Sequence, residues 1–132
     1  MNKEIAIKWL KQAQHDLKIA EKNIDIEGYD TAAFLAHQAV EKLFKAIFAI
    51  QGKPIPKTHY IDELAQQLGL SDDVINDVAD LTADYTFARY PDVAEHLPYE
   101  EYDEDIARSK VEKAKRIFEV LKKRYEKIEE EP

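Results

Sequence analysis

The chain contains no cysteine among its 132 residues, which excludes disulfides, thiolate zinc sites and catalytic thiols. Glycine is scarce, with three residues, whereas strands joined by tight turns usually need more of it. No apolar run approaches the roughly 20 residues that a membrane-spanning helix requires. The charged N-terminus is not typical of a signal peptide. These absences favour a helical protein that makes no contact with membranes, and they predict a cytoplasmic location.

Positive charge is also in short supply. Nineteen Lys and Arg residues face 27 Asp and Glu residues, for a formal net charge of −8. This balance argues against a general, charge-driven grip on nucleic acid. It leaves room for a local basic groove, because Lys42, Lys45, Lys53 and Lys57 are offset between residues 41 and 57 only by Glu41.

Apolar residues make up 45% of the chain and recur in steps of three and four through several segments, the spacing of amphipathic helices. The first segment ends at Gly28. The second, which Asp30 can cap, has a second apolar face, so we expect it at the centre of the fold. The predicted core positions of these two helices are Ala6, Leu10, Ala13, Leu17, Ala20 and Ile24, then Ala33, Ala36, Val40, Leu43, Ile47 and Ile50, with Phe34, Phe44 and Phe48 beside them.

Gly52, Pro54 and Pro56 then form a stiff connector. Thr58 is expected to cap a short helix and Ser71 a longer one, and Pro91 and Pro98 interrupt the helical period between residues 88 and 102. The core positions of these later helices are Ile61, Leu64 and Leu68, then Val74, Ile75, Val78, Leu81 and Tyr85, and finally Ile106, Ala114, Ile117, Leu121, Tyr125 and Ile128. Short connections favour antiparallel neighbours. We predict one all-α domain over residues 1–132, an antiparallel up-and-down bundle of four principal helices plus one short helix.

The positions of the four histidines do not predict a metal site. Di-iron bundles use Glu-x-x-His pairs, and none of the four histidines has a Glu three residues before it. His37 and Glu41 share a helical face but supply only two ligands. We expect no metal and no cofactor, with His37 a hydrogen-bonded histidine at the edge of the core and His15 exposed. Phosphate-binding glycine loops and the common hydrolase motifs are absent too.

The irregular segment is the most informative part of the sequence, since loops carry function disproportionately. It brings together Arg89, Tyr90, Asp92, His96 and Tyr99. A purely structural explanation also fits this composition. In that explanation Arg89 pairs with Asp92 or with a carbonyl, and a proline stiffens the exit from the preceding helix.

Four stretches in order give the chain a family likeness: Trp9–Ala13 with Asp16 and Leu17, Ala36–Lys42 running into Lys45 and Ala46, Pro56–His59, and Arg89–Asp92. With them the chain resembles the HEPN family, small helical domains linked to nucleotide and RNA chemistry. The resemblance implies a bundle that commonly forms a homodimer. It also implies frequent pairing with a small nucleotidyltransferase, in a toxin–antitoxin or substrate-binding role.

Active members of that family are metal-independent ribonucleases with an Arg and a His that are separated by roughly four to six residues. Here six residues separate Arg89 from His96. A neutral imidazole takes the proton of a ribose 2′-hydroxyl, and a guanidinium holds the phosphate. In the related toxins a modified Tyr often stands two positions after the His, where this chain has Pro98, followed by Tyr99.

Three functions therefore stay open. The first is a dimeric HEPN-like module that partners a small nucleotidyltransferase and binds a nucleotide or RNA. The second is a metal-independent endoribonuclease with Arg89 and His96 as catalytic residues. The third is a structural or interaction bundle without catalysis. For the first, the expected nucleotide- or RNA-binding residues are Arg89, Tyr90, Asp92, Tyr99, Lys42, Lys45 and Lys57.

Overall fold

The computed structural model describes residues 2–92 and 97–129. Within these ranges the chain is all-α, with no strand, as the sequence predicts. None of the described helices is long and apolar enough to cross a membrane. The helices are α1 (Lys3–Asp25), α2 (Tyr29–Ile50), α3 (Ile61–Gln67), α4 (Asp72–Thr82), α5 (Asp84–Phe87), α6 (Pro98–Glu101) and α7 (Glu104–Glu129).

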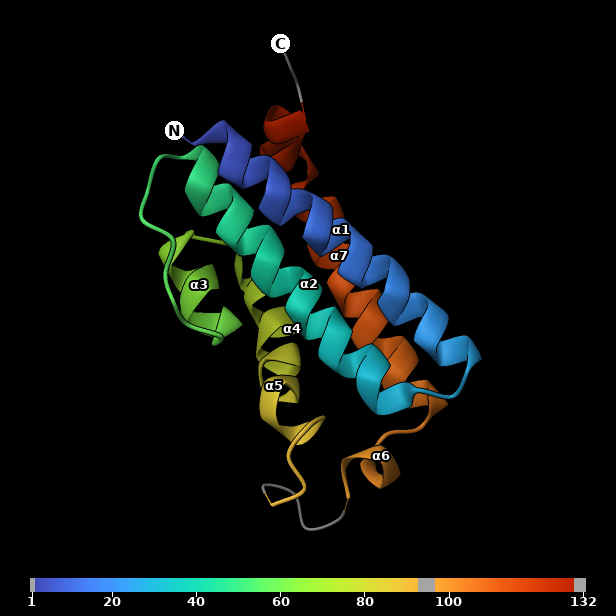
Figure 1. The fold of residues 1–132 in the computed structure, drawn as a ribbon. Helices are drawn as coiled ribbons and strands as arrows, with labels where there is room; N and C mark the ends of the chain where they lie inside the picture. The colour runs from blue at the N-terminus through green and yellow to red at the C-terminus, as the bar shows by residue number, and fades with distance from the viewer. Residues whose placement is uncertain (1, 93–96, 130–132) are drawn as a thin grey trace.

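Four principal helices, α1, α2, α4 and α7, alternate in direction along the chain (Figure 1). The predicted up-and-down bundle is therefore confirmed, and α3 is the predicted short helix. The single-turn helices α5 and α6 were not expected from the sequence. Pro98 opens α6 rather than preventing it, because a proline in the first helical turn lacks only an N–H that would have no partner there.

Helix α2 lies at the centre of the bundle, as its wide apolar face predicts. It contacts every other helix of the described chain. Its apolar side chains join those of α1, α3, α4 and α7 in the main core. Among the largest fully buried side chains are Phe44, Leu43, Ile47, Leu10 and Ile117. The buried residues of α2 also include three polar ones, which are His37, Glu41 and Lys45.

The turn between α1 and α2 differs from the expected one. The residue with left-handed geometry is Glu27, with φ of 62°, rather than Gly28. Gly28 has φ of −85° and occupies the N-cap position of α2, where Asp30 was expected. A Cβ on Gly28 would stand 2.8 Å from the Asn23 side-chain oxygen. A larger residue there would require the Asn23 side chain to shift, so glycine serves this position through its small size and not through a positive φ.

Two expected caps also act differently. The N-cap position of α3 is Tyr60, and the Thr58 hydroxyl instead accepts the Tyr60 N–H at 3.1 Å and donates to Glu63 at 3.4 Å. Ser71 does stand at the N-cap of α4, but its hydroxyl makes no capping hydrogen bond. Helices α3 and α4 begin close to the predicted residues. The side chains that were expected to cap their first backbone N–H groups do not do so.

The buried face of α7 begins one residue later than predicted. Ile106 is 37% exposed, whereas Ala107 and Val111 are buried. The Asp103 carboxylate accepts the Ile106 N–H at 2.8 Å, so Ile106 lies in the first turn of the helix. The remaining predicted positions from Ala114 to Leu121 and Ile128 are buried as expected.

Candidate functional site

Arg89 follows α5 and lies on an exposed surface surrounded by aromatic rings. Its guanidinium carbon is 4.8 Å from the centre of the Phe34 ring and 4.6 Å from the centres of the Tyr85 and Tyr90 rings. It also donates a hydrogen bond to the Tyr90 hydroxyl. Within the described ranges no carboxylate pairs with it, Asp92 included. The rings therefore hold the charge in place without neutralising it.

Tyr85 connects Arg89 to the connector between α2 and α3. Its ring stacks on the imidazole of His59, with centroids 4.4 Å apart and planes 11° apart. The same ring lies 5.5 Å from that of His37 and 6.1 Å from that of Phe34. A guanidinium and an imidazole thus lie against one tyrosine. The sequence indicated Tyr85 only as a core position.

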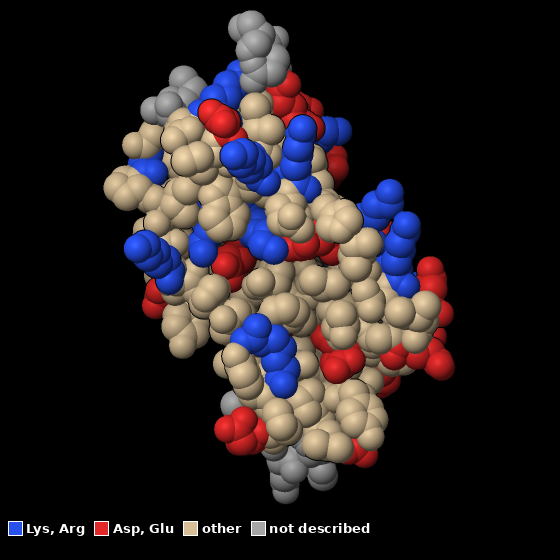
Figure 2. All heavy atoms as spheres, viewed as in Figure 1, with Lys and Arg blue, Asp and Glu red and all other residues tan. Residues whose placement is uncertain are grey.

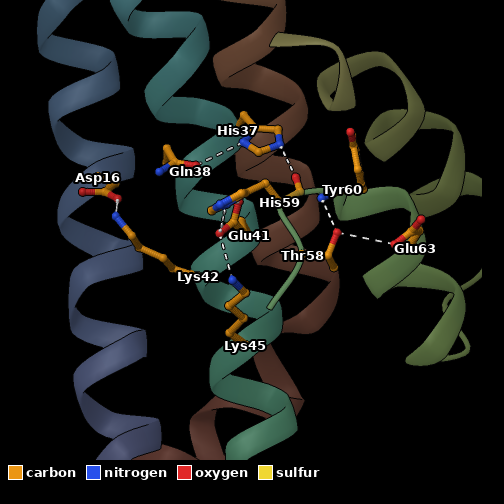
Figure 3. A network of polar contacts seen from close by, with 10 residues as sticks. All are labelled: Asp16, His37, Gln38, Glu41, Lys42, Lys45, Thr58, His59, Tyr60 and Glu63. Carbon is orange, nitrogen blue, oxygen red and sulfur yellow. Dashed lines mark hydrogen bonds and ion pairs between the residues drawn. The ribbon is translucent and has the colours of Figure 1, made fainter. Parts of the chain in front are cut away.

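His59 is held by a buried acid. Its Nδ1 lies 3.2 and 3.1 Å from the two carboxylate oxygens of Glu41, and Glu41 is only 3% exposed. The same carboxylate accepts a hydrogen bond from Lys45 at 3.0 Å. Figure 3 shows Glu41 between these two partners. One face of the central helix therefore carries a buried ion pair with a histidine attached to it.

A second histidine fastens the connector to α2. His37 is fully buried, and its Nε2 donates to the backbone carbonyl of His59 at 3.0 Å. Its Nδ1 lies 3.3 Å from the Gln38 side-chain oxygen. Burial lowers the pKa of His37, although Glu41 acts in the opposite direction. The prediction of a hydrogen-bonded histidine is confirmed, and His15 is exposed as expected.

The predicted binding lysines divide into two kinds. Lys42 forms an ion pair with Asp16 at 2.5 Å, and Lys45 is 6% exposed and engaged with Glu41. Lys57 is exposed and has no ion pair within the residues that the structure covers. In Figure 2, Lys and Arg side chains gather over the upper half of the face formed by α1 and α2. Lys57 therefore remains available to an anion, whereas Lys42 and Lys45 are neutralised by Asp16 and Glu41.

Asp84 anchors α5 to the rest of the bundle. Tyr102 donates a hydrogen bond to one oxygen of its buried carboxylate at 2.5 Å, and Lys110 lies 3.0 Å from the other. Burial raises the pKa of Asp84, while the Tyr102 hydrogen bond and Lys110 oppose the rise. Burial also raises the pKa of Tyr102. Arg89 comes two residues after the end of this helix, so the network fixes the helix from which the Arg89 backbone continues.

The remaining predicted site residues lie beside Arg89, on α6 or beyond the described ranges. Tyr99 is 65% exposed on α6, and Tyr90 is 42% exposed. His96 lies outside the described residues, as does the geometry of its pairing with Arg89. Within the described chain, no group of three His, Asp or Glu side chains is arranged to hold a metal ion.

The HEPN domain model matches residues 6–125. The chain belongs to the HEPN domain family. A search of curated proteins gives no match, and three solved structures resemble the HEPN fold described above. TT1696 from Thermus thermophilus is 26% identical, covers 94% of this chain and 99% of its own, and has a TM-score of 0.85.

The second structure, ST0689, is an archaeal HEPN homologue. It is 34% identical over 89% of this chain and 95% of its own, with a TM-score of 0.74. The third, a HEPN domain protein from Thermotoga maritima, is 19% identical over 88% of this chain and 95% of its own, with a TM-score of 0.71. At that identity it supports the fold alone.

The four stretches that carry the HEPN resemblance meet in space. Each contributes to a continuous line of contacts that starts on α1, passes through α2 and the connector, and ends after α5. The indole of Trp9 lies 5.5 Å from the Lys45 ammonium, which begins the line. In order, it contains Trp9, Lys45, Glu41, His59, Tyr85 and Arg89.

Proposed function

We propose that this HEPN-family chain is a dimeric binding module that holds the phosphate of a nucleotide or RNA at Arg89 and works beside a small nucleotidyltransferase. The observation that supports it most directly is the state of Arg89. Its guanidinium lies among three rings and has no carboxylate partner in the described ranges. In a chain with a net charge of −8, an arginine kept in this way is ready for an external anion.

The chemistry of the guanidinium favours phosphate in particular. Arginine presents five N–H donors in a planar fork and accepts no hydrogen bond, a geometry that matches two phosphate oxygens. The stacked rings orient the fork in advance, which reduces the entropy lost on binding. Lys57, Tyr90, Asp92 and Tyr99 are exposed and belong to the proposed ligand surface. Lys45 supports it from inside through its ion pair with Glu41, whereas Lys42 is engaged with Asp16.

Binding assays with matched arginine variants test this function. Fluorescence anisotropy with labelled RNA and calorimetry with nucleotides would compare the natural chain, Arg89→Ala and Arg89→Lys. A lost charge-assisted pair should weaken binding about tenfold to a hundredfold in Arg89→Ala, with Arg89→Lys between. Arg108→Ala is the control, because Arg108 is an exposed arginine that pairs with Glu104 on α7. Unchanged affinity in Arg89→Ala would reject the proposed site.

The assembly needs separate measurements. The family resemblance supports a homodimer and a nucleotidyltransferase partner, and sedimentation together with co-purification of a nucleotidyltransferase encoded alongside would examine both. We expect a dimer that retains the transferase. A monomer that retains neither transferase nor nucleotide would contradict the module.

The endoribonuclease is the second function that Arg89 favours, because a guanidinium without a carboxylate partner in the described ranges, seven positions before His96, could hold the scissile phosphate. RNA incubated with the protein and excess chelator should then yield 2′,3′-cyclic phosphate ends. The cut should vanish in both Arg89→Ala and His96→Ala, and cleavage that survives either change would reject the assignment. A structural bundle would instead show lost stability in Arg89→Ala and no change in any binding assay.

A further inference from the structure

The HEPN resemblance assigns no role to His59, yet its imidazole is prepared for a ligand. The side chain is 48% exposed and stacks on the same Tyr85 ring that Arg89 contacts. Its Nδ1 contacts the buried Glu41, and Nε2 is the ring nitrogen that this contact leaves free. Within the described chain Nε2 has no hydrogen-bond partner.

The hydrogen bond to Glu41 fixes the tautomer of this ring. A carboxylate only accepts hydrogen bonds, and that of Glu41 also accepts one from Lys45 at 3.0 Å. Nδ1 of His59 must therefore be the protonated nitrogen, which leaves Nε2 of the neutral ring as an acceptor. The surface beside Tyr85 thus combines a group that only donates, Arg89, with a nitrogen that accepts.

We infer that His59 recognises ribose: its Nε2 accepts a hydrogen bond from the 2′-hydroxyl of the nucleotide whose phosphate lies on Arg89. The 2′-hydroxyl is the donor that stands beside a phosphate in RNA and is missing from DNA. Both protein groups lie against the same ring, that of Tyr85. The site would then select ribonucleotides over deoxyribonucleotides. This inference rests on the proposed phosphate site at Arg89 and names the class of nucleotide that it takes.

The test compares labelled oligo(U) and oligo(dU) of equal length, which differ only in the sugar hydroxyls. For the natural chain we expect oligo(U) to bind more tightly by a factor on the order of five to ten, the usual effect of one neutral hydrogen bond. In His59→Phe, which keeps a ring against Tyr85 but has no acceptor, the ratio should fall to about one while oligo(dU) affinity is retained. His15→Phe, at an exposed histidine of α1, should leave the ratio unchanged.

The outcomes separate this inference from the proposed function. Equal binding of the two oligonucleotides by the natural chain would overturn the role of His59 and leave the phosphate site standing. Binding of neither would remove the phosphate site, and the inference with it. A ratio that persists in His59→Phe would also overturn the assignment.

A measurement on the natural chain covers the case in which His59→Phe fails to fold. Nitrogen-15 NMR of the imidazole should show an unprotonated Nε2 whose resonance moves on addition of oligo(U) and stays in place with oligo(dU). A protonated Nε2 in the neutral ring, or equal movement with both oligonucleotides, would contradict the inference.

Discussion

The buried pair of Glu41 and Lys45 offers a sharp test of the central helix. Lys45 is 6% exposed, and removing the acid alone, in Glu41→Ala, leaves its ammonium with no carboxylate to pair with. The nearby Trp9 ring lies 5.5 Å from that ammonium and cannot replace a full negative charge. Removing both charges together, in Glu41→Leu with Lys45→Met, fills the same space with apolar side chains.

The two changes should have very different effects on the free energy of unfolding. Breaking a buried pair by deleting one partner costs about 3–5 kcal/mol, whereas replacing the whole pair by apolar residues of similar volume is often close to neutral. The single variant would thus lose a large share of the roughly 5–15 kcal/mol that a domain has. The double variant should lie within about 1 kcal/mol of the natural chain, despite carrying two substitutions.

Urea titrations followed by circular dichroism measure both values. Glu104→Ala is the control, because Glu104 forms an exposed pair with Arg108 one turn along α7, and such pairs contribute about 0–1 kcal/mol. A single variant that unfolds like the control would show that Glu41 is not needed to compensate Lys45. A double variant as unstable as the single one would show that the pair itself, and not the orphaned ammonium, stabilises α2.

Two further predictions concern α5 and the turn after α1. Because burial raises the pKa of Asp84, its carboxyl contributes stability that is complete below the unfolded-state pKa and is lost as the pH rises through the folded-state pKa. Urea titrations from acid to neutral pH should show this loss in the natural chain relative to Asp84→Asn; parallel profiles would contradict it. Glu27→Gly should raise the free energy of unfolding by about 1 kcal/mol, because Glu27 has φ of 62° and is exposed. Thermal unfolding would refute this if the melting temperature did not rise.

The bundle could be predicted from the sequence because apolar spacing reports burial directly. Leu10 and Ala13 on α1, and Leu43 and Ile47 on α2, are buried as their spacing requires. The start of α7 was harder, since two apolar residues stand next to each other at positions 106 and 107. Periodicity alone does not decide which of two neighbours faces a helix that lies far away in sequence.

The candidate site could be predicted only in part. Arg89 was found because polar and aromatic residues gather where the helical period stops. The contacts that link Arg89 to His59 and Glu41 were not predicted. Glu41 and His59 are 18 positions apart, and the proline-rich connector between them has no helical periodicity from which its position in the fold could be predicted. Glu41 did leave a signal in the sequence, as an acid in the middle of a wide apolar face with a lysine one turn later.

The buried acid and lysine on α2 also bear on function. A buried ion pair is weak support for stability, and an apolar replacement serves folding equally well. The line from Trp9 to Arg89 nevertheless places such a pair at the centre of α2, with His59 attached to its acid. Groups that break a local rule of packing are expected where function requires them. If the double variant of Glu41 and Lys45 is as stable as the natural chain but binds oligo(U) and oligo(dU) alike, stability and ribose recognition are separate properties of the same residues. If it keeps its preference for oligo(U), Glu41 does not set the tautomer of His59.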